Sequence, residues 1–266
     1  ENLPTSELLR FQEGDIRDQG LVAKCCDQAD AVIHLAAVAS VQASVDDPAG
    51  THQSNFDGTL NLLEACRKSE IKRFLYACSA AIYGDTEVLP VKEETALNPL
   101  TPYAVDKLSG EYYLGYYSRQ YGLNTSSFRF FNIYGPRQDP TSPYSGVISI
   151  MADRLLSGRE MTIFGDGKQT RDFVYVGDLA DLLIESLTRT DMSGSVMNVG
   201  TGKQISLLDL KSALESVSGK TLKVSFDDAR KGDIKFSCAA VTRLVSCFGK
   251  APTTPIEDGL KELLGW

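Results

Sequence analysis

Residues 30–37 read DAVIHLAA, a short and almost continuous apolar run. RFLYACS (residues 73–79) is a second such run, and a long helical pattern covers about residues 48–69 between them. Runs of this length without polar alternation are typical of strands buried on both faces of a parallel sheet. Two such strands joined by a helix form a β-α-β unit with a right-handed connection. This stretch therefore predicts an α/β protein.

The same alternation continues on both sides of this unit. LLRFQEGD (residues 8–15) has the pattern of another strand, and a helical stretch follows it to about residue 29. NTSSFRFF (residues 124–131) and SVMNVGTG (residues 195–202) have the patterns of later strands. Strands that alternate regularly with helices predict a doubly wound, parallel, Rossmann-like sheet.

After Asn132 the pattern changes to a Pro-, Gly- and Ser-rich segment, YGPRQDPTSPYSG. Helical and strand patterns then resume, and the tail from Ser206 contains helices and one strand, LKVSF. We expect a nucleotide-binding part formed by residues 1–132 and 171–200. Residues 133–170 and 201–266 are expected to form a smaller substrate-binding lobe over the carboxyl ends of the strands.

Composition excludes several functional classes. The chain has 266 residues, 42% of them hydrophobic, with a net charge of −8 and a pI near 4.9. This charge argues against non-specific binding to nucleic acid. No apolar run approaches the roughly 20 residues of a membrane span, and no signal peptide is recognisable. Six cysteines without paired C-x-x-C motifs, and only two histidines, predict no metal site and a cytoplasmic protein with reduced thiols.

A glycine-rich nucleotide-binding loop is missing from the expected place. A doubly wound dinucleotide-binding domain begins with a strand, a G-x-G-x-x-G turn and a helix. GDGKQ (residues 165–169) comes too late in the chain, and GTGKQ (residues 200–204) has the wrong spacing. We therefore expect a first β-α-β unit of about 30 residues or more to precede Glu1. The alternative is that the protein does not bind a dinucleotide pyrophosphate in the usual way.

TPYAVDKLSG (residues 101–110) has the pattern of a helix start, with Thr101 as the capping residue and Pro102 in the first turn. Tyr103 and Lys107 are four residues apart and project from the same face. Such a pair occurs by chance in many proteins, so its meaning depends on the rest of the chain.

With CSAAIYGD (residues 78–85), this pair resembles the Ser-Tyr-Lys constellation of the extended short-chain dehydrogenase/reductase family. The resemblance covers nearly the whole chain and is most similar to the UDP-hexose and UDP-N-acetylhexosamine 4-epimerases. Further matching motifs occur in the expected order: EGDIRD (residues 13–18), HLAA (34–37), NFDGTLNLLEA (55–65), FRFFNIYGPRQDP (128–140), TRDFVYVGDLA (170–180) and NVGTG (198–202).

The resemblance implies a catalytic set of Ser79, Tyr103 and Lys107. Tyr103 would remove the proton of the sugar 4-hydroxyl as hydride passes to NAD, and Ser79 would bind the same hydroxyl. A phenol has a pKa near 10, and lowering it by three units requires about 4 kcal/mol. Lys107 and the cofactor's positive ring are expected to supply this stabilisation.

Two alanines favour epimerisation over other reactions of the family. Dehydratases carry an Asp-Glu pair after the serine, and decarboxylases carry a glutamate nearby. Ala80 and Ala81 occupy these positions and cannot transfer protons. A nucleotide-sugar 4,6-dehydratase, a UDP-glucuronate decarboxylase and a non-catalytic nucleotide-binding relative stay open as alternatives.

The resemblance also implies how a UDP-sugar and NAD would be bound. Arg171 and Arg230 would bind the diphosphate, although each alternatively forms a surface salt bridge. Ser237 takes the place of a bulky tyrosine in hexose-restricted epimerases and would admit an N-acetyl group, although it alternatively caps a helix. The other substrate-binding residues implied are Ser40, Asn132, Val147, Phe164 and Asp233. The cofactor-binding residues implied are Asp15, Ile16, Leu35, Ala36, Ala37, Asn55, Tyr103, Lys107 and Phe130.

Two further expectations concern packing. His34 lies inside a buried strand pattern and is expected to be a hydrogen-bonded core histidine. Tyr112, Tyr113, Tyr116 and Tyr117 are expected to pack in the core or at a subunit interface, since this helix and the one before it pair across a homodimer in the family. NAD rather than NADP is implied by the family alone.

Overall fold

The computed structural model describes residues 6–142, 146–229 and 234–265, and its centre is a four-stranded parallel sheet. Its strands lie in the order β1 (Ala31–His34), β2 (Arg73–Ser79), β3 (Asn124–Phe130) and β8 (Ser195–Val199). Ser79 pairs with Phe130, and Phe130 pairs with Val199, so the strands end together at one edge. The predicted α/β fold with a parallel, Rossmann-like sheet is confirmed.

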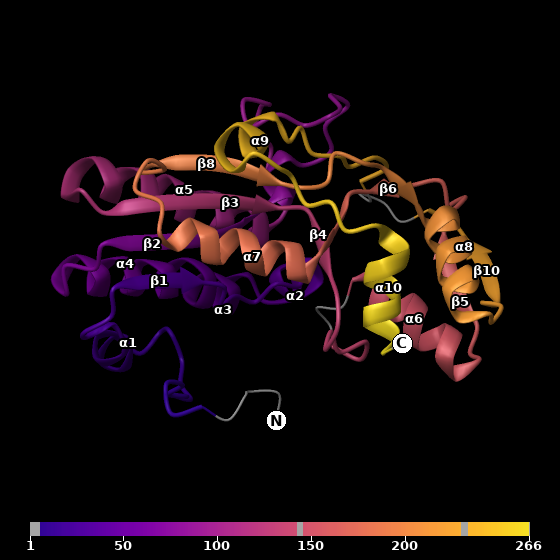
Figure 1. Cartoon of the computed structure of the whole chain (residues 1–266), viewed down its shortest axis with the longest axis horizontal. Helices are drawn as coiled ribbons and strands as arrows, with labels where there is room; N and C mark the ends of the chain where they lie inside the picture. Colours follow the sequence, from indigo (N-terminus) through magenta and orange to yellow (C-terminus); the bar gives the residue numbers. More distant parts are fainter. Residues whose placement is uncertain (1–5, 143–145, 230–233, 266) are drawn as a thin grey trace.

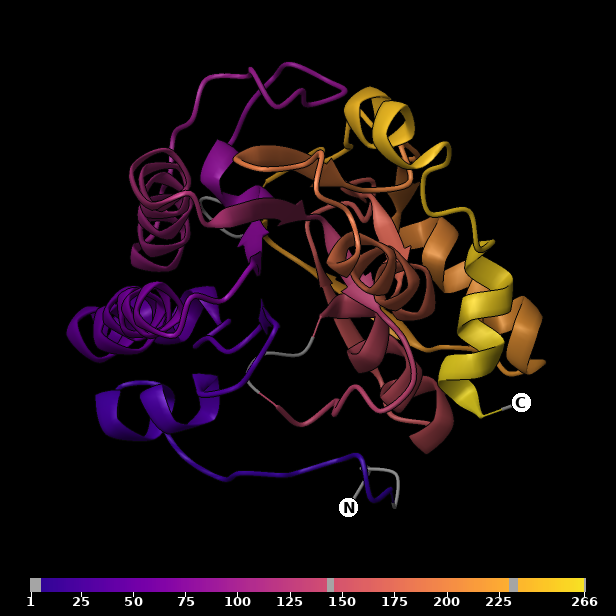
Figure 2. The same cartoon turned by 60° about the vertical axis from the view of Figure 1, so that its left-hand side comes forward.

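Helices cover both faces of this sheet (Figures 1 and 2). Successive side chains of β2 point to opposite faces. Phe74 and Tyr76 pack in one core with Leu63 and Leu114, whereas Leu75 packs in another core with Leu182. The helices of the first face are α1 (Gln19–Cys26), α4 (Gly58–Lys68) and α5 (Pro102–Tyr121); those of the second are α7 (Val176–Leu187) and α9 (Thr242–Phe248).

A helical run crosses from β1 to β2 over the first face. It consists of α2 (Val41–Asp46), α3 (Pro48–His52), the π-helical turn η1 (Gln53–Asp57) and α4. The sequence predicted one long helix here, and the structure inserts a π-helical turn in its middle. Among the described residues, no helix is both long and apolar enough to cross a membrane.

A smaller group of elements lies beyond the carboxyl ends of β3 and β8 (Figure 1). Its core contains Met151, Ile163, Leu210 and Leu260, each at most 1% exposed. Short strand pairs, β5 with β10, β4 with β7 and β6 with β9, connect the chain segments there. The elements are β4 (Asn132–Tyr134), α6 (Val147–Ser157), β5 (Met161–Phe164), β6 (Thr170–Arg171), β7 (Phe173–Tyr175), β9 (Ile205–Ser206), α8 (Leu207–Ser218), β10 (Val224–Asp227) and α10 (Ile256–Leu264).

The prediction of a strand at residues 8–15 is wrong. The segment forms no strand, and the Leu8 side chain is 97% exposed. A strand requires a neighbour whose backbone completes its hydrogen bonds. The segment does not pair with β1, whose described partner is β2 alone.

Candidate active site

Two cavities lie where the sheet meets the smaller group of elements. The first, which we call the strand-end cavity, has a volume of about 170 Å³. The second, which we call the lobe cavity, measures about 520 Å³ and is lined by residues of α6 and β5. Asn132 and Arg171 line both cavities, so the two spaces adjoin.

Ser79 reaches the strand-end cavity because it is the last residue of β2. Its backbone is still extended, and its hydroxyl oxygen accepts a hydrogen bond from Ala81 N at 3.1 Å. This contact caps the short 3₁₀ helix η2 (Ala80–Tyr83), which continues the wall of the cavity. The carboxyl end of a parallel strand is where α/β proteins place their ligands.

Tyr103 and Lys107 lie on the first two turns of α5, which begins as the sequence predicted. The Thr101 hydroxyl accepts from Ala104 N at 3.3 Å, and Pro102 occupies the first turn. The Lys107 ammonium is buried, donates to Ala77 O at 2.8 Å and lies 5.0 Å from the centre of the Tyr76 ring. An ammonium carries three protons, and Ala77 takes one of them.

Burial sets the pKa values of both side chains. It raises the pKa of the Tyr103 phenol above its usual 10, against the opposing effect of a hydrogen bond with Ser79. It also lowers the pKa of Lys107 to about 8. The expected lowering of the Tyr103 pKa depends on the charge of the cofactor as well as on Lys107, so it stays a prediction for the complex with NAD. The cost of placing an anion in a poorly solvated site exceeds the stabilisation that the protein provides.

The residues assigned to the cofactor follow β1 or face it. Leu35, Ala36 and Ala37 come directly after the last residue of β1. Asn55, which is 1% exposed, donates to Val38 O at 3.0 Å and accepts from Val38 N at 2.7 Å. The π-helical turn η1 therefore fixes the backbone of the loop after β1. Small side chains and a fixed backbone at this edge suit the close approach of a dinucleotide.

The other predicted cofactor residues lie in varied surroundings. Asp15 is exposed and forms a two-point ion pair with Arg17, whose Nη2 is 2.6 Å from Oδ2. Ile16 is half-buried and packs beside Gly58 at the start of α4. Phe130 lines the strand-end cavity. The described residues are therefore compatible with a dinucleotide bound along the edge of the sheet.

The predicted substrate residues gather at the two cavities. Ser237 lines the strand-end cavity, and Val147 and Phe164 line the lobe cavity. Ser40 instead caps α2, where its hydroxyl accepts from Ala43 N at 3.1 Å. Arg230 and Asp233 lie outside the described residues.

The chemistry available in the strand-end cavity is restricted. Ala80 and Ala81 line it, as does the ring of Tyr83. Among the described residues that line this cavity, none carries a carboxylate. In residues 6–142, 146–229 and 234–265, no group of three His, Cys, Asp or Glu side chains is arranged to hold a metal ion.

His34 is a buried core histidine, as the sequence predicted. It is 3% exposed, and its Nε2 lies 2.9 Å from Thr59 Oγ1. Burial, assisted by the charge of Lys107, lowers its pKa to about 3, so the ring is neutral at physiological pH.

Asp172 is a residue whose part in the site the sequence did not reveal. Its fully buried carboxylate accepts from Thr201 N, Thr201 Oγ1, Gly202 N and Ala239 N at 2.6–3.0 Å. Its carbonyl oxygen accepts from Asn132 N at 3.0 Å. It thus joins Arg171, Asn132 and the segment beside Ser237. An aspartate directly after a candidate diphosphate-binding arginine was the available signal.

The family of the chain follows from its similarity to known proteins. Residues 1–200 match the model of the NAD dependent epimerase/dehydratase family. A putative UDP-glucose 4-epimerase of Methanocaldococcus jannaschii is 37% identical over 96% of this chain and 83% of its own length.

Two solved structures are similar over nearly the whole chain. A UDP-N-acetylglucosamine 4-epimerase of Methanobrevibacter ruminantium, in complex with UDP-N-acetylmuramic acid, superposes with a TM-score of 0.94 at 37% identity. That superposition covers 100% of this chain and 84% of the other. A UDP-glucose 4-epimerase of Thermus thermophilus, in complex with NAD, gives 0.90 at 34% identity, covering 98% and 85%. The chain belongs to the NAD-dependent epimerase/dehydratase family.

Proposed function

We propose that the chain is an NAD-dependent 4-epimerase of UDP-sugars. One observation carries this proposal: Tyr103 lies near enough to Ser79, the last residue of β2, for Ser79 to affect its pKa, and the described lining of the adjoining strand-end cavity contains no carboxylate. The similar proteins that are named as UDP-sugar 4-epimerases support it.

The residues of the site can perform one reversible proton transfer. Tyr103 accepts the proton of the sugar 4-hydroxyl, and Ser79 binds the same oxygen, so that the 4-keto sugar forms and is then reduced from its other face. Bound NAD would supply the acceptor and donor for the C4 hydride, and its positive charge would favour the Tyr103 phenolate. Lys107 can bind a ribose hydroxyl of the cofactor with protons that Ala77 does not take. Dehydration or decarboxylation requires further acid and base groups, which Ala80 and Ala81 cannot supply.

The adjoining cavities match the two ends of a UDP-sugar. The sugar would occupy the strand-end cavity, and the uridine would lie in the lobe cavity against Val147 and Phe164. Arg171 borders both cavities and would bind the diphosphate between them through its guanidinium. The serine at position 237 gives the sugar end room for an N-acetyl group.

Product analysis tests the reaction. The purified protein, supplied with NAD, is incubated with UDP-galactose, UDP-N-acetylgalactosamine and UDP-glucuronate, and the products are identified by NMR. We expect the 4-epimers of the first two. A 4-keto-6-deoxy sugar would instead identify a dehydratase, and a pentose would identify a decarboxylase.

A pair of tyrosine variants tests the catalytic assignment. Tyr103→Phe should lower kcat by roughly 10²–10⁴-fold, the usual contribution of general acid–base catalysis. Tyr121→Phe is the control, because the Tyr121 side chain is 45% exposed at the other end of the same helix. Wild-type activity in Tyr103→Phe would remove Tyr103 from the mechanism.

We also propose a cytoplasmic homodimer that pairs through α4 and α5. Tyr112, Tyr113 and Tyr116 of α5 are each more than 40% exposed. Tyrosine is enriched at protein–protein interfaces, so this exposed group favours pairing with a second copy. Sedimentation velocity should give a dimer, and a monomer at micromolar concentration would contradict this proposal.

Digestion at surface loops tests the expected division of the chain into a nucleotide-binding part, residues 1–132 and 171–200, and a substrate-binding lobe, residues 133–170 and 201–266.

A further inference from the structure

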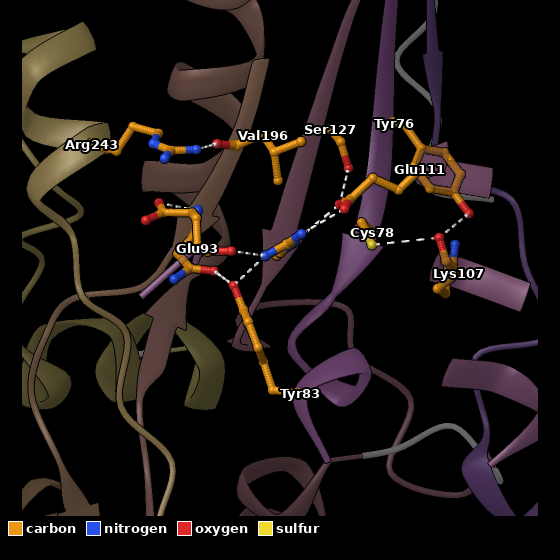
Figure 3. Close-up of polar contacts among 11 residues, drawn as sticks. Tyr76, Cys78, Tyr83, Glu93, Lys107, Glu111, Ser127, Val196 and Arg243 are labelled. Carbon is orange, nitrogen blue, oxygen red and sulfur yellow. Dashed lines mark hydrogen bonds and ion pairs between the residues drawn. The ribbon is translucent and has the colours of Figure 1, made fainter. Parts of the chain in front are cut away.

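A buried ion pair joins the helix of Tyr103 to the central sheet (Figure 3). Arg129 of β3 donates to Glu111 of α5 through Nε at 3.0 Å and Nη2 at 2.6 Å. Their side chains are only 5% and 4% exposed. The Ser127 hydroxyl donates to the same carboxylate at 2.8 Å.

Stability alone is a weak explanation for this pair. Removing two charges from water costs several kcal/mol per ion, and apolar replacements of similar volume often stabilise a protein equally well or better. A doubly hydrogen-bonded fork does, however, define one relative position of the two elements that carry it. Glu111 follows Lys107 by four residues and Tyr103 by eight, so all three lie along one side of α5.

The other edge of the Arg129 guanidinium faces the turn that follows Ser79. Its Nη1 lies 2.6 Å from Tyr83 Oη and 2.9 Å from Glu93 O. The Tyr83 hydroxyl donates to Asn198 Oδ1 of β8 at 2.7 Å. Tyr83 is the last residue of η2, the 3₁₀ helix that Ser79 caps. Figure 3 shows that Tyr83 and Glu111 come from different elements.

We propose that Glu111, Arg129 and Tyr83 form a positioning chain that sets the separation of Ser79 and Tyr103. This inference rests on the proposed function, since it assigns the positioning chain a role in that reaction. Ser79 and Tyr103 come from different elements, β2 and α5, and share one substrate oxygen in the mechanism. Misplacement by about 1 Å costs on the order of 10²-fold in rate. A rigid connection behind the two hydroxyls therefore has a catalytic use.

Two single variants and one control separate positioning from stability. Tyr83→Phe removes the hydroxyl between Arg129 and Asn198 and keeps the ring. Glu111→Gln keeps the shape and removes the charge of a residue that does not line either cavity. Tyr117→Phe is the matched control. Tyr117 lies on α5 like Glu111, but its hydroxyl donates to Glu64 of α4 at 2.5 Å, and neither residue lines a cavity.

The expected result is a fall in kcat without a comparable change in KM. Tyr83→Phe and Glu111→Gln should lower kcat by roughly 10–100-fold, and KM for the UDP-sugar should change less than about threefold. Tyr117→Phe should keep both parameters. Unchanged kcat per folded enzyme in Tyr83→Phe and Glu111→Gln, or a rise in KM alone, overturns the proposal.

A double variant tests the purely structural explanation. Glu111→Leu with Arg129→Met replaces the ion pair by apolar side chains of similar size. Because Glu93 O and the Ser127 hydroxyl lose their partners, the melting temperature should fall somewhat, and kcat is compared per folded enzyme. If the ion pair positions Ser79 and Tyr103, the folded double variant should have a kcat as low as that of Glu111→Gln. A stable double variant with wild-type kcat overturns the proposal.

An NMR readout does not depend on turnover. With tyrosine labelled at Cζ, the Tyr103 resonance is assigned by its loss in Tyr103→Phe, and its shift reports the surroundings of the Tyr103 hydroxyl, which include Ser79. It should move in Tyr83→Phe and Glu111→Gln and stay in place in Tyr117→Phe. A wild-type protein inactive on every UDP-sugar contradicts the proposed function, whereas an unmoved resonance contradicts the positioning chain.

Discussion

Asp172→Asn is the substitution for which the structure gives the most definite expectation. In the wild type, Oδ1 accepts from Thr201 N at 2.7 Å and from Thr201 Oγ1 at 2.6 Å. Oδ2 accepts from Gly202 N and Ala239 N, both at 3.0 Å. An asparagine replaces one of these two acceptors by an NH₂ group, which cannot accept.

The two possible orientations of the asparagine differ in cost. With NH₂ toward Gly202 and Ala239, two backbone N–H groups lose their acceptor. With NH₂ toward Thr201, the threonine hydroxyl can rotate to accept, and only Thr201 N is left unpaired. The second orientation should therefore be adopted. One orphaned buried N–H costs about 1–3 kcal/mol, and the loss of charge from the remaining bonds adds about 1 kcal/mol.

A destabilisation of about 3 kcal/mol corresponds to a fall in melting temperature of roughly 6–12 °C for a chain of this size. Thermal unfolding followed by circular dichroism measures it. Because Asp172 holds Arg171 and the segment beside Ser237, KM for the UDP-sugar should also rise, by roughly tenfold.

Asp178 provides a matched control for this experiment. Its carboxylate accepts from Thr253 N, Thr254 N and the Thr254 hydroxyl at 2.8–3.0 Å, away from both cavities. Asp178→Asn should lower the melting temperature and leave KM unchanged. The reasoning fails if Asp172→Asn melts within about 2 °C of the wild type, or if both variants raise KM equally.

Three other variants have definite expected outcomes. His34 has a pKa near 6.5 in the unfolded chain and about 3 in the folded protein. The free energy of unfolding should therefore fall as the pH drops from 6.5 towards 3, by up to about 1.4 kcal/mol per pH unit. Urea unfolding of His34→Gln between pH 7 and pH 4 should show a shallower decline, and an identical decline would contradict the assignment. Gly110→Ala places a methyl group in collision with Tyr76 Oη and should cost about 1–3 kcal/mol in urea unfolding, whereas Gly115→Ala, whose nearest neighbour is a flexible arginine end, should not. Ser237→Tyr should abolish turnover of UDP-N-acetylgalactosamine and keep that of UDP-galactose in steady-state assays; equal use of both would exclude Ser237 as a determinant of specificity.

Local pattern was sufficient to predict the central elements of the fold. The strand at Arg73–Ser79 has the predicted bounds, because an uninterrupted apolar run between a helix end and a turn has few alternatives in an α/β chain. The start of α5 was predictable for a similar reason, since Thr101 and Pro102 act within one turn. Residues 8–15 have a strand-like pattern too, but pairing depends on a neighbouring strand, which local sequence does not specify.

From helical and strand periodicity alone, the candidate site was predictable only where its residues are neighbours in sequence; Ser79, Arg171 and Ser237 were identified through the family resemblance. Tyr103 and Lys107 are connected by helical periodicity. Asp172 reaches Thr201 and Ala239 across 29 and 67 positions, and Arg129 reaches Tyr83 across 46. A single sequence contains no signal for such pairs. The raised pKa of Tyr103 in the protein alone was also not predictable, because the direction of its shift depends on burial by distant segments.

Burial of the reactive pair has two opposing consequences. It raises the pKa of Tyr103 and lowers that of Lys107, so each group alone is held toward its neutral form. The same low polarity strengthens the attraction between a phenolate and an ammonium, since Coulomb energy varies inversely with the dielectric constant. A charge-separated pair is therefore favourable only when the two groups are held at close range. Accurate placement then matters more than the intrinsic acidity of either group. For this reason we expect the connections behind Ser79 and α5 to affect the rate of the proposed reaction as well as the hydroxyls themselves.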